Sequence, residues 1–182
     1  MKRTLLTALI LALPLLLNAQ RLQLDNSSTI LIKGTSTMHD WESTVEEVNG
    51  NMEVSLNGDQ LTAIKALDFA FTVESIKSGK KKMDKLTYEA FDFEENPKIS
   101  FKLTSVKKLE GNQAVVVGNL TMAGNTQEVE ISGTCEYNDG AVKVTASHPI
   151  NMVQFGMERP TAMLGAIKVG EEVIIDFTLN FK

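Results

Sequence analysis

Apolar and polar residues alternate along most of the chain from about residue 20 onward. In the final segment, Val173, Ile175, Phe177, Leu179 and Phe181 take every second position, with mostly polar residues between them. The same alternation occurs in four earlier segments: residues 67–74, 99–104, 128–137 and 142–146. A period of two puts alternate side chains on opposite faces of a strand, so the pattern predicts antiparallel strands with one apolar and one solvated face.

Short turn sequences separate these segments. They are Asn57-Gly58-Asp59, Glu110-Gly111-Asn112, Ala123-Gly124-Asn125 and Asn138-Asp139-Gly140. Gly, Asn and Asp tolerate the positive φ angles that tight hairpins require. Eight or more strands at this spacing, with no long helix between them, predict an all-β barrel or sandwich.

One segment, residues 84–91, lacks the strand alternation. Met83, Leu86 and Ala90 fall near helical spacing, and Asp84 can cap the N-terminus of a helix there. Pro97 lies just before the next predicted strand and restricts any helix to earlier residues. We expect one short helix near one end of the barrel.

The N-terminus has the three-part pattern of a secretory signal peptide. Lys2 and Arg3 precede an apolar run over residues 5–17, and Asn18-Ala19-Gln20 supplies a small residue at the expected cleavage point. The run is shorter than the roughly 20 residues that span a bilayer, which leaves a retained anchor as the alternative. We expect a signal peptide at residues 1–19, a single domain at residues 20–182, no membrane span after cleavage, and a periplasmic or secreted protein.

Composition and charge exclude some classes of function. The chain has 182 residues, of which 43% are hydrophobic, as in an ordinary globular domain. Loss of residues 1–19 changes the formal net charge from −5 to −7, so binding to nucleic acid is not expected. The single cysteine, Cys135, rules out an internal disulfide, and its place in an alternating segment predicts a buried, inert thiol.

The inward positions leave two interpretations of the interior open. A barrel of about eight strands has room for packed side chains or for one small ligand. The inward side chains can fill the barrel as an ordinary core. Alternatively, the small residues among them can leave an apolar channel for a hydrophobic guest. The inward set is Phe69, Phe71, Phe101, Val116, Gly118, Ile131, Gly133 and Phe177.

Three parts of the sequence resemble the YceI-like proteins. The first part, residues 71–106, contains Ser75-Ile76, Met83-Asp84, Phe91-Asp92, Asn96-Pro97 and Ile99-x-Phe101. The others are residues 34–41, Gly-Thr-Ser-Thr-Met-His-Asp-Trp, and residues 118–126, Gly-Asn-Leu-Thr-Met-Ala-Gly-Asn-Thr. The resemblance covers residues 22–182. It implies an extended lipocalin-like barrel of eight antiparallel strands, exported from the cytoplasm, that binds a long isoprenoid chain in an apolar tunnel. Some members are dimers, so a homodimer is one of the assemblies that the resemblance implies.

The resemblance and the inward pattern together predict the ligand-contacting residues. They are Trp41, Phe69, Phe71, Val73, Met83, Leu86, Phe91, Phe101, Val116, Ile131 and Phe177. For a polar headgroup we expect His39, Lys80, Lys81 and Lys82, since cations attract a phosphate or diphosphate. The alternatives are that Trp41 packs in the core, that His39 bonds locally, and that the lysines form a solvated turn.

No catalytic or metal-binding motif is present. The sequence lacks a Gly-x-Ser-x-Gly elbow, a phosphate loop, a dinucleotide fingerprint and a His-x-x-x-His pair, and we expect no cofactor. His39 and His148 are far apart in the sequence and form no metal-binding motif. His148 precedes Pro149 and is expected at the end of a strand. The preferred hypothesis is a non-enzymatic carrier of a hydrophobic molecule. An envelope interaction or stress protein with a filled barrel, and an envelope enzyme, are the alternatives.

Overall fold

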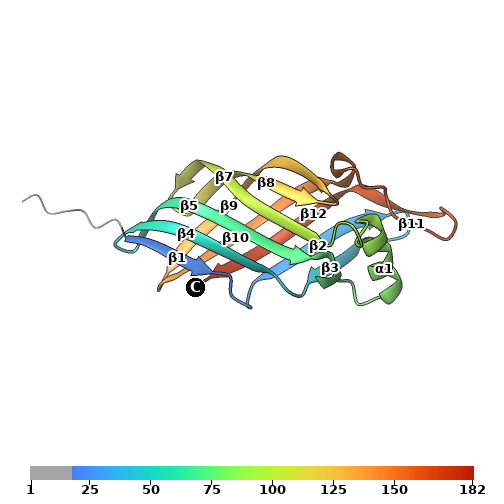
Figure 1. The fold of residues 1–182 in the computed structure, drawn as a ribbon, viewed down its shortest axis with the longest axis horizontal. Helices are drawn as coiled ribbons and strands as arrows, with labels where there is room; N and C mark the ends of the chain where they lie inside the picture. The colour runs from blue at the N-terminus through green and yellow to red at the C-terminus, as the bar shows by residue number, and fades with distance from the viewer. Residues whose placement is uncertain (1–17) are drawn as a thin grey trace, which may run out of the picture.

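The computed structural model describes residues 18–182, which form one curled antiparallel sheet with a short helix at one end (Figure 1). The strands are β1 (Asn18–Gln23), β2 (Thr29–Ser36), β3 (Trp41–Val45), β4 (Asn49–Asn57), β5 (Gln60–Thr72), β6 (Ile76–Lys77), β7 (Lys98–Glu110), β8 (Gln113–Met122), β9 (Asn125–Asn138), β10 (Ala141–Asn151), β11 (Thr161–Ala162) and β12 (Ile167–Phe181). The helices are α1 (Lys81–Ala90) and the 3₁₀ helices η1 (Val73–Ser75) and η2 (Met152–Phe155). The predicted signal peptide lies outside the described residues, except for its last two, which begin β1.

Residues 18–182 contain twelve strands where eight were predicted, because three barrel strands are interrupted and β11 is added. A turn at Asp25 separates β1 from β2, residues 46–48 separate β3 from β4, and η1 separates β5 from β6. The two parts of each interrupted strand still occupy one strand position of the barrel. β1 pairs with β4 while β2 pairs with β3, and β4 pairs with β5 while β3 pairs with β6. β11 is an addition that pairs only with β12. The barrel therefore has eight strand positions in simple up-and-down order.

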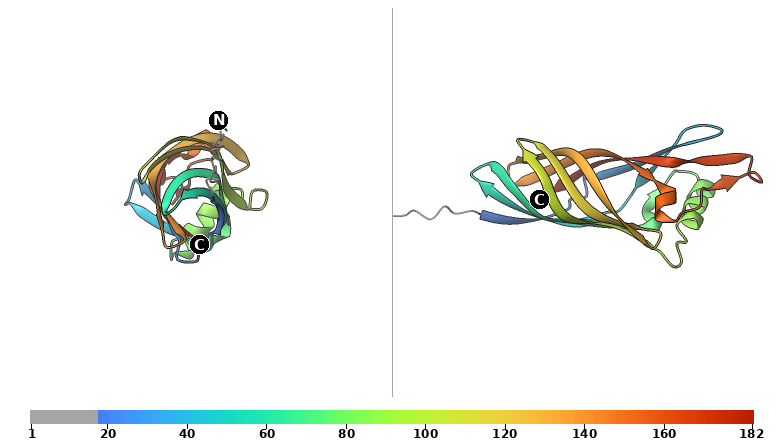
Figure 2. Two further views of the ribbon diagram at one scale, coloured as in Figure 1. Left: turned by 90° about the vertical axis from the view of Figure 1, so that its left-hand side faces the viewer. Right: turned by 90° about the horizontal axis from the view of Figure 1, so that it is seen from above.

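The first and last strand positions close the barrel on each other. β2 pairs with β12 over Thr29–Ser36. Beyond the turn, the Gln23 and Lys182 backbones exchange two hydrogen bonds of 2.8 Å, and the Asp25 N–H donates to the Asn180 carbonyl at 2.7 Å. These hydrogen bonds join the edges of the first and last strands from Gln23 to Ser36. The end-on view in Figure 2 shows the sheet curled around a central axis.

All four predicted turns join neighbouring strands. Gly58, Gly111, Gly124 and Gly140 have φ angles of 60°, 55°, 73° and 82°, the left-handed region that favours glycine. A further hairpin, between β11 and β12, was not predicted, because its turn residues are Met163 and Leu164.

The short helix exists, but its N-cap lies four residues earlier than predicted. Lys80, not Asp84, is the N-cap residue of α1, and it makes no side-chain capping bond. The Asp84 carboxylate instead accepts hydrogen bonds from the backbone N–H and the hydroxyl of Ser78, at 2.8 and 2.6 Å. Asp84 thus fixes the loop that precedes the helix. α1 lies at the end of the barrel opposite the C-terminus (Figure 1).

The other half of the barrel, toward β1 and the C-terminus, is mostly filled by side chains and leaves a cavity of only about 30 Å³. Val54, Leu179 and Phe181 are fully buried there, and Met52 and Val142 are 1% exposed. Each such side chain contributes about 1.5–3 kcal/mol when it leaves water. This half of the interior is therefore an ordinary core. Among residues 18–182, no helix is long and apolar enough to cross a membrane.

The seam at Asp25 predicts an acid-sensitive contribution to stability. The Ser27 hydroxyl and backbone N–H, and then the Lys182 ammonium, lower the pKa of Asp25 from 3.8 to about 2. A lowered pKa stabilises the fold above the unfolded value, and this stabilisation disappears as the pH falls through about 2. Asp25→Asn should therefore lower the urea midpoint at pH about 5, and the difference from the parent should vanish toward pH 2.

Asp59→Asn, in the exposed turn between β4 and β5, is the matched control and should leave the midpoint unchanged at both pH values. A difference between Asp25→Asn and the parent that stays constant down to pH 2 would show that the charge of Asp25 does not contribute.

Candidate ligand-binding site

An apolar cavity of about 160 Å³ occupies the half of the barrel next to α1 and is partly open to solvent. Its wall takes side chains from nearly every barrel strand, from α1 and from the segment around η2. The lining residues are Ile30, Ile32, Trp41, Ser43, Phe69, Phe71, Ile76, Met83, Leu86, Thr87, Ala90, Phe91, Ile99, Phe101, Leu120, Met122, Ile131, His148, Ile150, Met152, Met157, Pro160, Val169, Val173, Ile175 and Phe177.

Strand register places the wall residues in rows across the sheet. One row joins His148, Ile175, Ile32 and Ser43, which are direct partners across β10, β12, β2 and β3. All four line the cavity, because residues opposite each other in antiparallel strands project from the same face. The cavity wall is therefore a direct product of the register.

The next row explains the position of the only tryptophan. Ile150, Val173, Gly34 and Trp41 are consecutive partners across the same four strands. A Cβ at Gly34 would lie 2.3 Å from the Trp41 ring, so the indole lies directly over this glycine. The Trp41 N–H donates to the Thr35 carbonyl at 3.1 Å. Gly34 thus provides the space that lets the indole form part of the wall.

Helix α1 covers one side of the cavity. Met83, Leu86, Ala90 and Phe91 face the interior. Tyr88 attaches the helix to η1 and β6, since its hydroxyl accepts a hydrogen bond of 2.7 Å from the Lys77 ammonium and donates to the Glu74 carbonyl at 3.1 Å. The ammonium lies 5.4 Å from the Tyr88 ring centroid. The hydrogen bond to Tyr88 raises the pKa of Lys77, so the contact persists at neutral pH.

Three phenylalanine rings form the floor of the cavity. Phe69 and Phe101 are partners on β5 and β7 and stack with centroids 5.4 Å apart, and Phe177 lies 6.3 Å from Phe69. The three rings and Ile131 also line a second cavity of about 30 Å³ on the opposite side. The channel predicted to run through the barrel is thus divided, and the cavity next to α1 is a blind pocket.

Gly118 has the opposite effect to the one expected. Its lack of a side chain was expected to widen a channel. A Cβ at Gly118 would lie 2.3 Å from the Phe101 ring, so the glycine accommodates the ring that closes the bore. Gly133 is also closely packed, since a Cβ there would lie 2.5 Å from the Thr145 carbonyl.

The wall carries three polar residues, Ser43, Thr87 and His148, and no acidic, Lys or Arg side chain. Burial lowers the pKa of His148, which keeps the imidazole neutral at neutral pH. A charged group of a ligand would find no counter-ion on this wall. The site therefore suits an apolar chain.

Most of the predicted contact residues lie on the wall. These are Trp41, Phe69, Phe71, Met83, Leu86, Phe91, Phe101, Ile131 and Phe177. Val116 lines only the smaller cavity, and Val73 is fully buried in η1, off the wall. That any of them binds a ligand stays a prediction.

The four predicted headgroup residues are exposed and lie off the wall. His39 bonds locally, with its Nδ1 2.6 Å from the Asp40 carbonyl oxygen. Lys80, Lys81 and Lys82 belong to the start of α1, and within residues 18–182 none of them forms an ion pair. Their role toward a headgroup stays a prediction.

The sequence analysis did not predict several of the wall residues. For His148, the sequence contained a signal that would have placed it on the wall. It lies within β10, not at a strand end, and continues the alternation of Val142, Val144 and Ala146 toward Ile150. Pro149 suggested a strand end, because proline has no N–H to donate to a neighbouring strand. It is accommodated here because β10 pairs with β9 only as far as Ala146, which leaves that edge unpaired at Pro149. The methionines Met122, Met152 and Met157 had no such signal, since their strand and loop positions meet only in the folded barrel.

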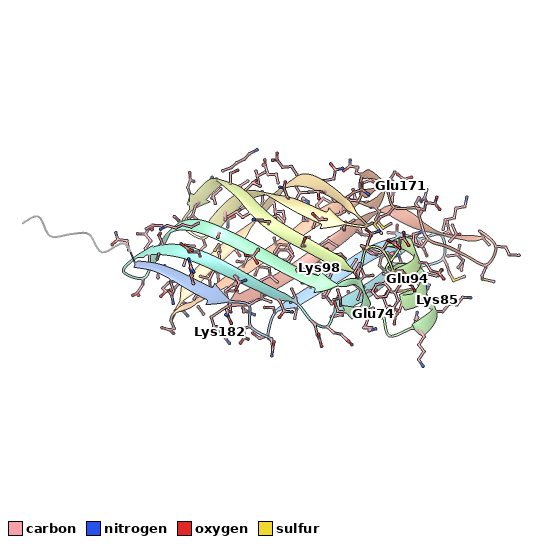
Figure 3. All side chains as sticks on the ribbon, in the orientation of Figure 1. Glu74, Lys85, Glu94, Lys98, Glu171 and Lys182 are labelled. Carbon is pink, nitrogen blue, oxygen red and sulfur yellow. The ribbon has the colours of Figure 1, made fainter. Side chains whose placement is uncertain are left out.

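Charged side chains lie on the outer surface of the barrel. Glu74, Lys85, Glu94 and Glu171 project outward near α1, and Lys182 lies at the opposite end (Figure 3). Within the described part of the chain, no group of three or more His, Cys, Asp or Glu residues is placed to hold a metal ion.

A closed antiparallel barrel around an apolar cavity defines the lipocalin-like class of barrels. The YceI-like domain matches residues 22–181 of the sequence. The chain therefore belongs to the YceI-like family. No curated protein matches it.

Solved structures share the fold at low sequence identity. BcnA of Burkholderia cenocepacia aligns with a TM-score of 0.71 at 19% identity, covering 86% of this chain and 98% of its own. A polyisoprenoid binding domain from Saccharophagus degradans, implicated in plant cell wall breakdown, aligns at 0.70 and 11% identity, covering 88% and 97%. The YceI protein of Campylobacter jejuni aligns at 0.61 and 14% identity, covering 76% and 82%.

The chemistry of Cys135 gives a testable prediction. Burial raises the pKa of its thiol to about 12, and the side chain is 2% exposed on the wall of the smaller cavity. Because the thiolate is the reactive form, native protein should react with an aromatic disulfide reagent at least about a hundredfold more slowly than protein in denaturant. Stopped-flow absorbance measures both rates. A native rate like that of a free cysteine peptide would contradict the burial.

Proposed function

We propose that this protein is a non-enzymatic binder and carrier of a long hydrophobic, isoprenoid-type molecule, whose apolar end enters the cavity next to α1. One observation carries the proposal: the cavity wall is almost wholly apolar and uncharged, and the cavity is partly open. Membership of the YceI-like family and the shared fold with the Saccharophagus polyisoprenoid binding domain support it.

The cavity volume limits what enters. An apolar protein cavity of about 150 Å³ accommodates one benzene molecule, which has six carbons. The present cavity of about 160 Å³ therefore accommodates roughly one isoprene unit of five carbons in this conformation. Four lining methionines, Met83, Met122, Met152 and Met157, have flexible side chains that can repack around a longer segment. The rest of the chain extends out through the opening.

Export and the absence of catalysis are parts of the same proposal. The basic start, apolar run and small residue at Ala19 support secretion to the periplasm or beyond. A carrier needs only shape and apolar surface, which the wall supplies, and the proposal gives no residue a catalytic role.

Tryptophan fluorescence tests the proposal directly. Trp41 is the only tryptophan and lies on the cavity wall, so a ligand that enters the cavity should change its emission. Titration with farnesol should give a saturable change. Ala90→Leu places a larger side chain in the cavity while keeping a good helix former, and it should weaken farnesol binding about tenfold.

Lys85→Leu is the matched control, because it makes a similar change on the exposed side of the same helix, and it should bind farnesol like the parent. Absence of a saturable signal in the parent, together with no lipid in an organic extract of protein purified from its host, would favour an interaction protein instead.

The aromatic floor predicts a limit on chain length. In the parent, affinity should stop rising once a longer isoprenoid alcohol reaches Phe69, Phe101 and Phe177. Phe101→Leu should join the two cavities and let the affinity rise further from prenol, which has one isoprene unit, to geraniol, which has two. The gain should be about tenfold, since each additional buried CH₂ contributes about 0.8 kcal/mol. Fluorescence titration of both alcohols measures the ratio.

Phe181→Leu makes the same change in the filled half, where Phe181 is fully buried, and serves as the control for stability. Each variant should lose about 1–2 kcal/mol of unfolding free energy. An unchanged affinity ratio in Phe101→Leu would show that the rings do not limit the depth of the site.

A further inference from the structure

The hairpin between β11 and β12 has a turn of unusual composition. Met163 and Leu164 have φ angles of 50° and 55°, and the Gly165 N–H donates to the Ala162 carbonyl at 3.1 Å. With Gly165, whose φ angle is 87°, they form three consecutive left-handed positions in the four-residue loop between Ala162 and Ile167, and such positions favour Asn, Asp and Gly. The turn between β9 and β10 follows that preference with Asp139-Gly140.

Both turn side chains are also exposed to solvent. Met163 is 66% exposed and Leu164 is 110% exposed. The positive φ angles favour Asn and Gly at these positions, and solubility favours polar residues. Neither backbone conformation nor solubility therefore explains why Met163 and Leu164 occupy the turn. Positions that break local rules without a structural gain are expected at functional sites.

A second loop brings another exposed apolar side chain beside the hairpin. The Thr37 backbone N–H donates to the Lys168 carbonyl at 3.0 Å, and the Thr37 hydroxyl bonds the Ala166 carbonyl at 3.3 Å. Met38, the next residue, is 62% exposed. The β2–β3 loop and the hairpin are thus joined, and both expose apolar tips.

The hairpin is continuous with the cavity wall. Pro160 and Val169 line the cavity, and the Val169 N–H donates to the Pro160 carbonyl at 3.1 Å. The next inward-facing pair along the hairpin is Ala162 with Ile167, and between these pairs Thr161 and Lys168 face the other way. One face of the hairpin is therefore an apolar strip that runs from the cavity to the turn.

We propose that the tips formed by Met38, Met163 and Leu164 insert into the surface of a phospholipid bilayer, and that a lipid chain passes along the hairpin strip into the cavity. The hairpin extends beyond the α1 end of the barrel (Figure 1). From Val169 to Ile167 the strand rises by two residues, or about 7 Å at 3.4 Å per residue, and the turn of residues 163–166 projects beyond it. The tips can therefore enter the interfacial layer, about 5–10 Å deep, while the opening of the cavity stays close to the bilayer surface.

A membrane fits these tips better than a second copy of the chain. A stable protein interface involves about 20–30 residues on each side, whereas the tips present three apolar side chains. Three projecting side chains with polar neighbours suit insertion among lipid headgroups. The route of the chain rests on the proposed function, but insertion itself does not require it.

Vesicle sedimentation tests the insertion separately from ligand binding. The parent should sediment with sucrose-loaded phosphatidylcholine vesicles that contain no isoprenoid, and sedimentation should persist at about 1 M salt, where the Debye length is about 3 Å. The double variant Met163→Asn with Leu164→Gly should lower the partition coefficient about tenfold or more. Its unfolding midpoint should be equal or higher, because Asn and Gly adopt the positive φ angles of positions 163 and 164 more readily than Met and Leu.

Ile174→Ser is the matched control, since it removes a 42% exposed apolar side chain from the outer wall of β12, and it should sediment like the parent. All proteins carry the same N-terminus, so any contribution of the apolar N-terminal sequence is common to them. Three results would overturn insertion: the tip variant sediments as much as the parent, the parent does not sediment with vesicles, or its sedimentation is lost at high salt. So would a dimer, seen by light scattering without vesicles, that the tip variant abolishes.

Farnesol binding by Trp41 fluorescence, without vesicles, should be unchanged in the tip variant. Vesicle binding that depends on the tips, combined with no isoprenoid binding by the parent, would reject the proposed function and leave membrane insertion standing.

Discussion

The packing of Phe69, Phe101 and Phe177 across the middle of the barrel is the contact on which the rest of the structure depends. The three rings seal the filled half, where side chains pack as in any core, and they form the floor of the cavity in the other half. Gly118 makes their arrangement possible, because any side chain there would occupy the position of the Phe101 ring. Stability and cavity shape are thus both determined by one aromatic cluster.

The two ends of the barrel have different roles. At one end the seam around Asp25 and Lys182 ties the first strand to the last, and side chains leave only the cavity of about 30 Å³. At the other end α1, the β2–β3 loop and the β11–β12 hairpin surround the cavity. Loops and short elements held by a rigid sheet are the usual location of binding residues, because they can vary without disturbing the core. The functional proposals all concern this second end.

The fold was predicted from the alternation of apolar and polar residues and from the turn residues between the strands. Strands occur where every second residue is apolar, and hairpins occur at the four Gly-containing turns. The helix start was wrong because Asp84 bonds the preceding loop, which a capping rule cannot distinguish from a cap. The strand count differed because local breaks at Asp25, residues 46–48 and η1 each divide one barrel strand in two, and because β11 is added beside β12.

The sequence by itself determined which side chains point inward, since a strand's period of two follows from backbone geometry alone. Only the tertiary structure decided whether the interior is filled or hollow, because that depends on which inward side chains meet across the barrel. His148 and Ser43, more than a hundred residues apart, share one row of the wall through the strand register. Gly118 likewise closes the bore instead of opening it, because the ring that covers it comes from the neighbouring strand. Register and closure act between distant segments, and a local pattern does not contain them.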